Sequence, residues 1–304
     1  MRISTNTMFH SGISKITSLQ ADQSKLQNQI STGKKFTTPA EDPVGAARAL
    51  EVTHHKEVNN TYATVRKTAI SNLETVEASL TNVTNLLVSA QSTLVAAGNG
   101  AYSNKERANI ATTLQNSLDS LVGMANGKDV YGNYLYSGFK SDSPAFVATA
   151  TGATYSGDSN VQLLQVDAQR QMEVSVSGDS VFQAGGNDVF ATMRNIITLL
   201  NTPITDATTQ AAFTSGLATA IDGMKASADT VLNVRASVGS RLNELDSLDL
   251  AGQDRDLQYD SALLDIQDLD YASAISDFTR NETILEAAQK TFSATTQLSL
   301  FKYI

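Results

Sequence analysis

The chain has 304 residues, a formal net charge of −9 and no cysteine. The absence of cysteine excludes disulfides, thiolate nucleophiles and cysteine-based metal sites, and the negative charge argues against nucleic acid as a partner. The length predicts two or three domains, and the presence of only four prolines leaves room for very long helices. No run of about 18 apolar residues predicts a membrane span, and the first residues do not resemble a secretory signal.

The first predicted helix runs from near residue 5 to Thr32, with Gly33 as its C-cap. Its apolar residues recur at steps of three and four, which places one narrow seam on one face of the helix. This N-terminal seam consists of Phe9, Ile13, Ile16, Leu19, Leu26 and Ile30. A single helix with such a seam is marginal in water, so the arm is expected to need a partner.

Two further helices are predicted before the middle of the chain. Asp42 is expected to cap the first of them, with Pro43 at its first helical position. Its apolar seam continues to a pair of glycines, Gly98 and Gly100. The next helix opens with the capping-box pattern Ser103–Glu106 and stops at Asn126 and Gly127. The short loop between these helices predicts antiparallel neighbours.

The middle of the chain changes character after Tyr131. Turn formers and aromatic residues come first, and then alternating apolar residues at Gln162–Val166 and at Met172–Val176. Ser-Gly-Asp sequences at 156–158 and 177–179 are interpreted as turns that bound these strands. The pattern predicts a small, mostly β insert.

Helical patterns return at Val189–Leu200, and Asp206 is expected to cap another long helix. A break at Gly252 is expected before an acidic stretch, which precedes the C-terminal helix. The apolar side of that last helix consists of Phe278, Leu285, Phe292, Leu298 and Phe301. The fold class is therefore mainly α with a small β insert, and the two terminal helices are expected to pair with each other.

Charge is distributed unevenly along the chain. Residues 1–40 carry five basic residues against Asp22 alone, a balance of +5 − 1 = +4, and residues 246–270 carry eight aspartates against Arg255, a balance of 1 − 8 = −7. One interpretation is two solvated helix faces, and the other is that the far end of the basic arm lies beside the acidic stretch. Exposed ion pairs would contribute only about 0.2–1 kcal/mol each, so they would set register more than stability.

The sequence offers little that would support catalysis or metal binding. His54 and His55 lack the spacing that puts two ligands on one helix face. The glycines of residues 123–129 are interpreted as a helix end rather than a phosphate loop, and the aspartates of residues 265–270 lack the glycine and final glutamate of a calcium loop. We therefore expect no enzyme activity, no metal and no cofactor.

Several segments resemble the flagellin superfamily. Ser31–Leu50, which contains Asp42 and Pro43, resembles the loop between its first two helices, and Ala228–Leu245 is similar to a helix motif that Arg235, Gly239 and Asn243 match. Within the superfamily, Tyr134–Phe146, Asp268–Phe278 and the ending Leu298–Ile304 resemble the hook-filament junction proteins. The insert shows no useful resemblance.

The resemblance implies a three-part organisation. Residues 1–40 and 268–304 would form an inner coiled-coil domain that lines the axial tube of the flagellum. Residues 41–138 and 186–267 would form a helical bundle around it, and residues 139–185 a small outward β domain.

The resemblance also implies how the protein is exported and assembled. The protein would leave the cell through the flagellar type III export system after a cytoplasmic chaperone has held its C-terminal helix. It would then assemble as a ring of identical subunits between the proximal hook-associated junction protein and the flagellin filament. No nucleic acid and no membrane insertion are expected.

Three alternatives stay open at this point. A short, minor flagellin would form filaments by itself, although Pro39 and the ending Leu298–Ile304 argue against it. A coiled-coil binding or signalling module would predict contact with a membrane or receptor. An enzyme within the β insert is the third alternative, but the insert contains no histidine.

Overall fold

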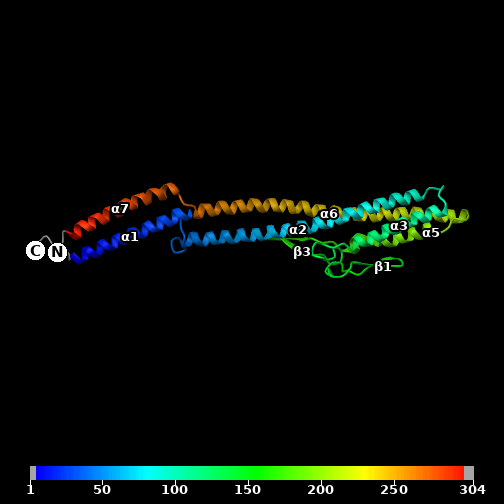
Figure 1. Ribbon diagram of the computed structural model, residues 1–304, viewed down its shortest axis with the longest axis horizontal. Coiled ribbons are helices and arrows are strands. Elements are labelled where there is room, and N and C mark those ends of the chain that lie inside the picture. Colours follow the sequence, from blue (N-terminus) through cyan, green and yellow to red (C-terminus); the bar gives the residue numbers. More distant parts are fainter. Residues whose placement is uncertain (1–4, 298–304) are drawn as a thin grey trace. The chain divides into compact units, whose positions relative to one another are not determined.

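Helices make up most of the chain in the computed structural model, which describes residues 5–297 (Figure 1). The long helices are α1 (Thr5–Thr32), α2 (Pro43–Ala97), α3 (Asn104–Ala125), α5 (Val189–Asn201), α6 (Ala207–Gln267) and α7 (Tyr271–Gln297). Between α3 and α5 lie β1 (Phe146–Thr149), β2 (Gly152–Tyr155), β3 (Leu163–Asp167), β4 (Arg170–Glu173), the short helix α4 (Gly178–Phe182) and the 3₁₀ turn η1 (Ala184–Gly186). The predicted fold class, mainly α with a small β insert, is confirmed.

The chain divides into two units. The first consists of Met1–Asn59 with Asp254–Ile304, and the second of Asn60–Gln253. Both divisions fall inside long helices, α2 and α6, which contribute residues to each unit.

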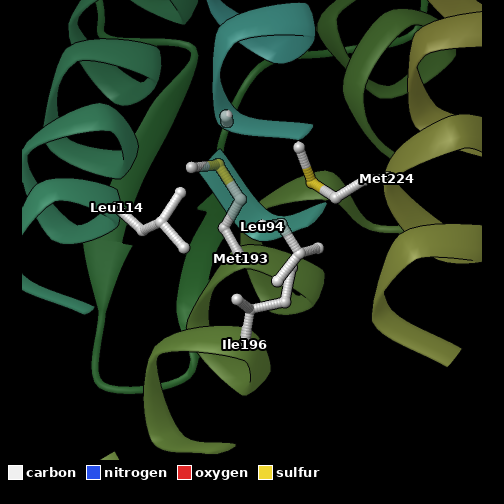
Figure 2. A pocket seen from close by; sticks show the side chains of 6 residues that line it. Leu94, Leu114, Met193, Ile196 and Met224 are labelled. Carbon is white, nitrogen blue, oxygen red and sulfur yellow. The ribbon is translucent and has the colours of Figure 1, made fainter. Parts of the chain in front are cut away.

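The core of the second unit is built from the predicted apolar seams. Ala69, Leu73, Leu80 and Leu94 of α2 are fully buried, and residues of α3, α5 and α6 join them in one continuous hydrophobic cluster. Figure 2 shows one place where these helices meet. The side chains there are Leu94, Leu114, Met193, Ile196 and Met224, and they leave no space for a water molecule. This dry, close-packed interior is a structural core and not a ligand site.

Local sequence signals set the helix ends. Ser103 and Glu106 form the predicted capping box at the start of α3, and Asp206 accepts a hydrogen bond of 2.8 Å from the backbone N–H of Thr209 at the start of α6. Asp188 caps α5 in the same way, by accepting from the N–H groups of the second and third helical residues. Each cap satisfies amide groups that a helix leaves unpaired at its first turn.

The insert contains two antiparallel hairpins, β1–β2 and β3–β4. The second hairpin lies where the alternating pattern predicts it, whereas the first was not resolved as a pair of strands by that pattern. The expected turn at 177–179 is wrong, because α4 begins at Gly178. There Phe182 packs edge-on to Tyr136 and Phe146, at ring-centroid distances of 5.3 and 5.4 Å, and this contact favours a helical turn over an exposed one.

The expected helix break at Gly252 is also wrong. α6 continues through this residue to Gln267 (Figure 1). A Cβ atom at position 252 would lie 2.3 Å from Nη2 of Arg66. Arg66 is only 1% exposed, and its guanidinium donates to Asp249 (3.2 Å) and to the carbonyl of Val166 (3.3 Å). Glycine at 252 therefore makes room for a buried arginine that links α2, α6 and β3.

Two glycines of α6 provide a matched test of this explanation. Gly252→Ala should lower the melting temperature of the full chain, because overpacking against a fixed guanidinium costs about 1–3 kcal/mol. Gly239→Ala is the control, because nothing lies within 4 Å of its added Cβ. It should raise stability by up to about 1 kcal/mol, the helix-propensity difference. Thermal unfolding followed by circular dichroism measures both, and equal effects of the two substitutions would contradict the role assigned to Gly252.

Candidate assembly surface of the terminal helices

α1 and α7 lie side by side in the first unit (Figure 1). Leu285 and Ala274 of α7 are buried between them. The other seam residues that the sequence predicts here are half-buried: Ile16, Leu19, Leu26, Ile30, Phe278 and Phe292. The predicted pairing of the two terminal helices is therefore confirmed, although two of the predicted side chains, Leu298 and Phe301, lie outside the described residues.

Two specific contacts fix how the pair fits together. The ring of Phe292 packs over Gly12, where a Cβ atom would lie 2.6 Å from the ring, and its centroid is 5.3 Å from that of Phe9. Asn281 donates a hydrogen bond of 3.2 Å from its side chain to the carbonyl of Leu19. This polar contact within an otherwise apolar seam favours one register of α1 against α7, as single buried amides do in coiled coils.

The pair leaves much of its apolar surface uncovered. Phe9 and Ile13 are 43% and 42% exposed although they belong to the seam, and Met8 is 54% exposed. Met8 and Phe9, together with Ile284 and Phe292, line an open groove of about 1200 Å³ between the two helices. Contiguous apolar surface of this kind marks an interaction site in a soluble protein.

The far end of the pair is held by a short backbone bridge. Lys34 and Asp268 form an antiparallel β-bridge, in which the N–H of Lys35 donates to the carbonyl of Gln267 (2.7 Å) and that of Leu269 donates to Gly33 (3.1 Å). Gly33 ends α1 with φ +69°, as the C-cap prediction requires. The bridge thus joins the α1–α2 connection to the α6–α7 connection.

The bridge also decides between the two interpretations of the charge pattern. The basic arm does end beside the acidic stretch, through the backbone of Lys34 and Asp268. Within the stretch, Asp260 accepts a hydrogen bond from Lys56 of α2, which raises the pKa of this lysine, and Asp256 lies 3.8 Å from the same ammonium group. The side chains of Asp256 and Asp260 therefore pair with α2, whereas the basic arm meets the acidic stretch through its backbone.

Asp42 and Pro43 occupy the predicted positions at the start of α2. The carboxylate of Asp42 accepts a hydrogen bond of 2.8 Å from the N–H of Gly45, the third helical residue, and α2 begins at Pro43. Glu41 accepts from the N–H of Thr37 (3.0 Å) and so orders the loop that leads into the cap.

The remaining predicted residues lie in the second unit, on α6. Arg235 donates from Nε and Nη2 to one oxygen of Glu77 at 2.9 and 2.6 Å, and thereby ties α6 to α2. Gly239 has open space around it, and Asn243 is exposed. These two residues are therefore not explained by packing within the chain.

His54 and His55 lie on α2, and the ring of His55 stacks on Tyr259 at 6.4 Å. Within residues 5–297 no group of His, Asp or Glu side chains is arranged to hold a metal ion, and no helix in that range is long and apolar enough to span a membrane. What the terminal helices offer is a half-covered apolar seam of defined register.

Sequence reasoning missed Gly12 and Asn281, which fix the fit of the pair. Neither has a local signal, because a glycine inside a helix and an asparagine in a seam each count against the pattern. Their partners, Phe292 and the Leu19 carbonyl, lie more than 250 residues away in the chain.

Comparison with known proteins agrees with this arrangement. Residues 3–141 match the family model described as bacterial flagellin N-terminal helical region. The part of the chain that contains α1, α2 and α3 is thus a flagellin-type helical region.

Relatives that match along the whole chain identify the family more specifically. The chain is 35% identical to flagellar hook-associated protein 3 of Salmonella typhimurium and 34% identical to that of Escherichia coli, in each case over 99% of both chains. The crystal structure of the flagellar junction protein FlgL from Legionella pneumophila has a similar fold, with a TM-score of 0.64 at 19% identity, over 73% of this chain and 100% of that one. The chain belongs to the family of flagellar hook-associated protein 3.

The cap at Asp42 can be tested by substitution. Asp42→Ala should lower the free energy of unfolding by roughly 0.5–2 kcal/mol, because the N–H of Gly45 loses its acceptor. Asp42→Asn keeps an acceptor oxygen and should retain most of the stability. Chemical denaturation of the full chain measures both variants, and an unchanged midpoint for Asp42→Ala would count against the cap.

Proposed function

We propose that this chain is a structural component of the bacterial flagellum that acts as the adaptor between the hook and the flagellin filament. The single observation that carries the proposal is the near-complete match to flagellar hook-associated protein 3, at 35% identity over 99% of both chains. The half-covered seam of α1 and α7 supports it, because such a surface suits a subunit that completes its core by assembly.

The three-part organisation belongs to this proposal. Residues 1–40 and 268–304 serve as the inner coiled-coil domain, residues 41–138 and 186–267 as the surrounding helical bundle, and residues 139–185 as a small outward β domain. The seam residues, from Phe9 to Ile30 and from Phe278 to Phe301, are the assembly surface of the inner domain. Asp42, Pro43, Arg235, Gly239 and Asn243 are motif residues that position or complete that assembly.

Partners follow from the same proposal. The subunit binds copies of itself in a ring, the proximal hook-associated junction protein on one side and flagellin on the other. It travels through the flagellar type III export system to the outside of the cell. Before export, a chaperone covers the apolar side of α7 in the cytoplasm, since an exposed apolar helix would otherwise aggregate. No catalytic activity or cofactor enters this role.

A minor flagellin is the alternative. The observation that favours it is the match of residues 3–141 to the flagellin N-terminal helical region. The two functions differ in one simple behaviour. A purified minor flagellin polymerises alone into long filaments, whereas a junction adaptor requires its neighbours on both sides.

A double substitution on α7 tests the shared use of its apolar side. Leu285→Asp with Phe292→Asp should abolish both chaperone binding and incorporation into flagella, because Leu285 is buried against α1 and Phe292 packs on Gly12. Ser276→Asp with Thr283→Asp is the matched control. Both residues are exposed, and the two substitutions add the same negative charge as the seam variant. Pull-down with the chaperone and immunoblots of isolated flagella measure the two activities.

The fold of the double variant can be checked, and one result would contradict the shared surface. The core of the second unit contains neither substituted residue, so its helical circular dichroism should persist. A seam variant that loses incorporation but binds the chaperone with unaltered affinity would refute the shared surface.

A further inference from the structure

The β3–β4 hairpin contacts a charge that the second unit buries. The guanidinium of Arg66 on α2 is 1% exposed, and it donates a hydrogen bond of 3.3 Å to the backbone carbonyl of Val166 in β3. On α6 the same group donates to Asp249 at 3.2 Å. Val166 and Met172 of the hairpin are themselves buried in the hydrophobic cluster of this unit. The hairpin is therefore one of the elements that keep Arg66 out of water.

Two ion pairs join the hairpin to α6. Arg170 donates from Nε and Nη2 to the two carboxylate oxygens of Glu244 at 2.5 and 2.8 Å, and Arg241 donates to the carboxylate of Glu173. The strand and the helix thus each contribute one acid and one base. A hairpin docked in the opposite direction would bring Arg170 against Arg241 and Glu173 against Glu244, and like charges disfavour that arrangement. The crossed pairs therefore set the direction in which the hairpin lies on α6.

The same pairs are open to solvent. The side chains of Arg170 and Glu244 are 51% and 38% exposed, and that of Glu173 is 44% exposed. Ion pairs at such positions are screened by salt and contribute little singly. A two-stranded hairpin also has little stability of its own in water. The docked position of the hairpin therefore depends on contacts that dissolved ions weaken.

The closed position also has a cost that opening would remove. A buried charge has lost its hydration, and Arg66 would regain that hydration if the hairpin lifted. The base of the hairpin is closed by two hydrogen bonds. The N–H of Val174 donates to the carbonyl of Gln162 at 2.9 Å, and the N–H of Gln162 donates to the hydroxyl of Ser175 at 2.8 Å. These bonds favour movement of the hairpin as one piece.

We propose that the β3–β4 hairpin is a strap that opens and closes over Arg66 as one piece, and that the two crossed ion pairs hold it closed. The closed strap joins α2 to α6 through Arg66. Its opening leaves α3 and α5 packed, because the partners named above all belong to α2, α6 and the hairpin. The strap makes the insert a working part of the helical bundle, and it does not depend on the assembly that the chain joins.

Removal of both carboxylates tests the strap in the full chain. Glu173→Gln with Glu244→Gln should raise amide exchange in residues 163–173 about three- to tenfold, because both ion pairs are lost, and should leave exchange in α3 and α5 unchanged. Raising the ionic strength from about 0.01 to about 0.15 M should also speed exchange in residues 163–173 of the unsubstituted chain, with a smaller effect in the variant. Hydrogen exchange followed by mass spectrometry measures each rate.

A charge swap separates the ion pair from other effects of substitution. Arg170→Glu alone places two acids together and should speed exchange in the strap, whereas Arg170→Glu with Glu244→Arg should return it to within about twofold of the unsubstituted chain, since the attraction is restored. Asp277→Asn is the control, because it removes an exposed ion pair with Arg280 on α7. It should leave exchange in residues 163–173 unchanged.

Chemical modification of Arg66 gives a second readout. Phenylglyoxal reacts with guanidinium groups that it can reach, and Arg66 becomes accessible only when the strap lifts. At limiting reagent, peptide mass spectrometry should show that Glu173→Gln with Glu244→Gln speeds the modification of Arg66 by about the same factor as the amide exchange. An unchanged rate of Arg66 modification beside faster exchange in the hairpin would show that the hairpin does not cover Arg66.

Two further results would overturn the strap. If residues 163–173 exchange no faster than the buried amides of α2, in the unsubstituted chain and in the variant, the hairpin opens only with the whole unit. If the glutamine substitutions speed exchange in α3 and α5 as much as in the hairpin, the pairs stabilise the unit and hold no strap. Should a variant lose its helical circular dichroism, the unsubstituted chain decides, and exchange in residues 163–173 that does not rise with salt contradicts the proposal.

Discussion

The arrangement of the first unit depends on two backbone hydrogen bonds, from Lys35 to Gln267 and from Leu269 to Gly33. They close the ends of a chain in which more than 230 residues intervene, and they do so where α1 gives way to α2 and α6 to α7. Because both connections are fixed at the same point, α1 and α7 leave it together. Their seams can then meet without a long entropic search by either arm alone.

The pair of helices α1 and α7 cannot bury all of its apolar surface. Two helices have one contact face between them, so each seam is covered on one side only. Leu285 is buried, yet Phe9 and Ile13 stay more than 40% exposed. A pair of this kind gains less from apolar burial than the second unit, where four helices enclose fully buried leucines. The difference assigns stability to the second unit and availability for binding to the first.

Local patterns explain how much of this could be predicted from sequence. The seams, the caps at Asp42, Ser103 and Asp206 and the C-cap at Gly33 all depend on residues within one or two turns, and each was predicted. Gly252 was misinterpreted because its meaning depends on Arg66, a residue 186 positions away that needs the space. Asn281 and Gly12 were missed for the same reason, because their partners lie more than 250 residues away in the chain. Family resemblance identified Gly239 and Asn243, which packing within the chain does not explain.

The central claim is that α1 and α7 complete their core only in the assembly. Hydrogen exchange measured by mass spectrometry on the verified monomer, and on the same protein within isolated flagella, tests it most directly. The account predicts fast amide exchange in residues 5–30 of the monomer, strong protection of the second unit's buried helices, and protection of residues 5–30 after assembly. Strong protection of residues 5–30 in the monomer, unchanged by assembly, would contradict it.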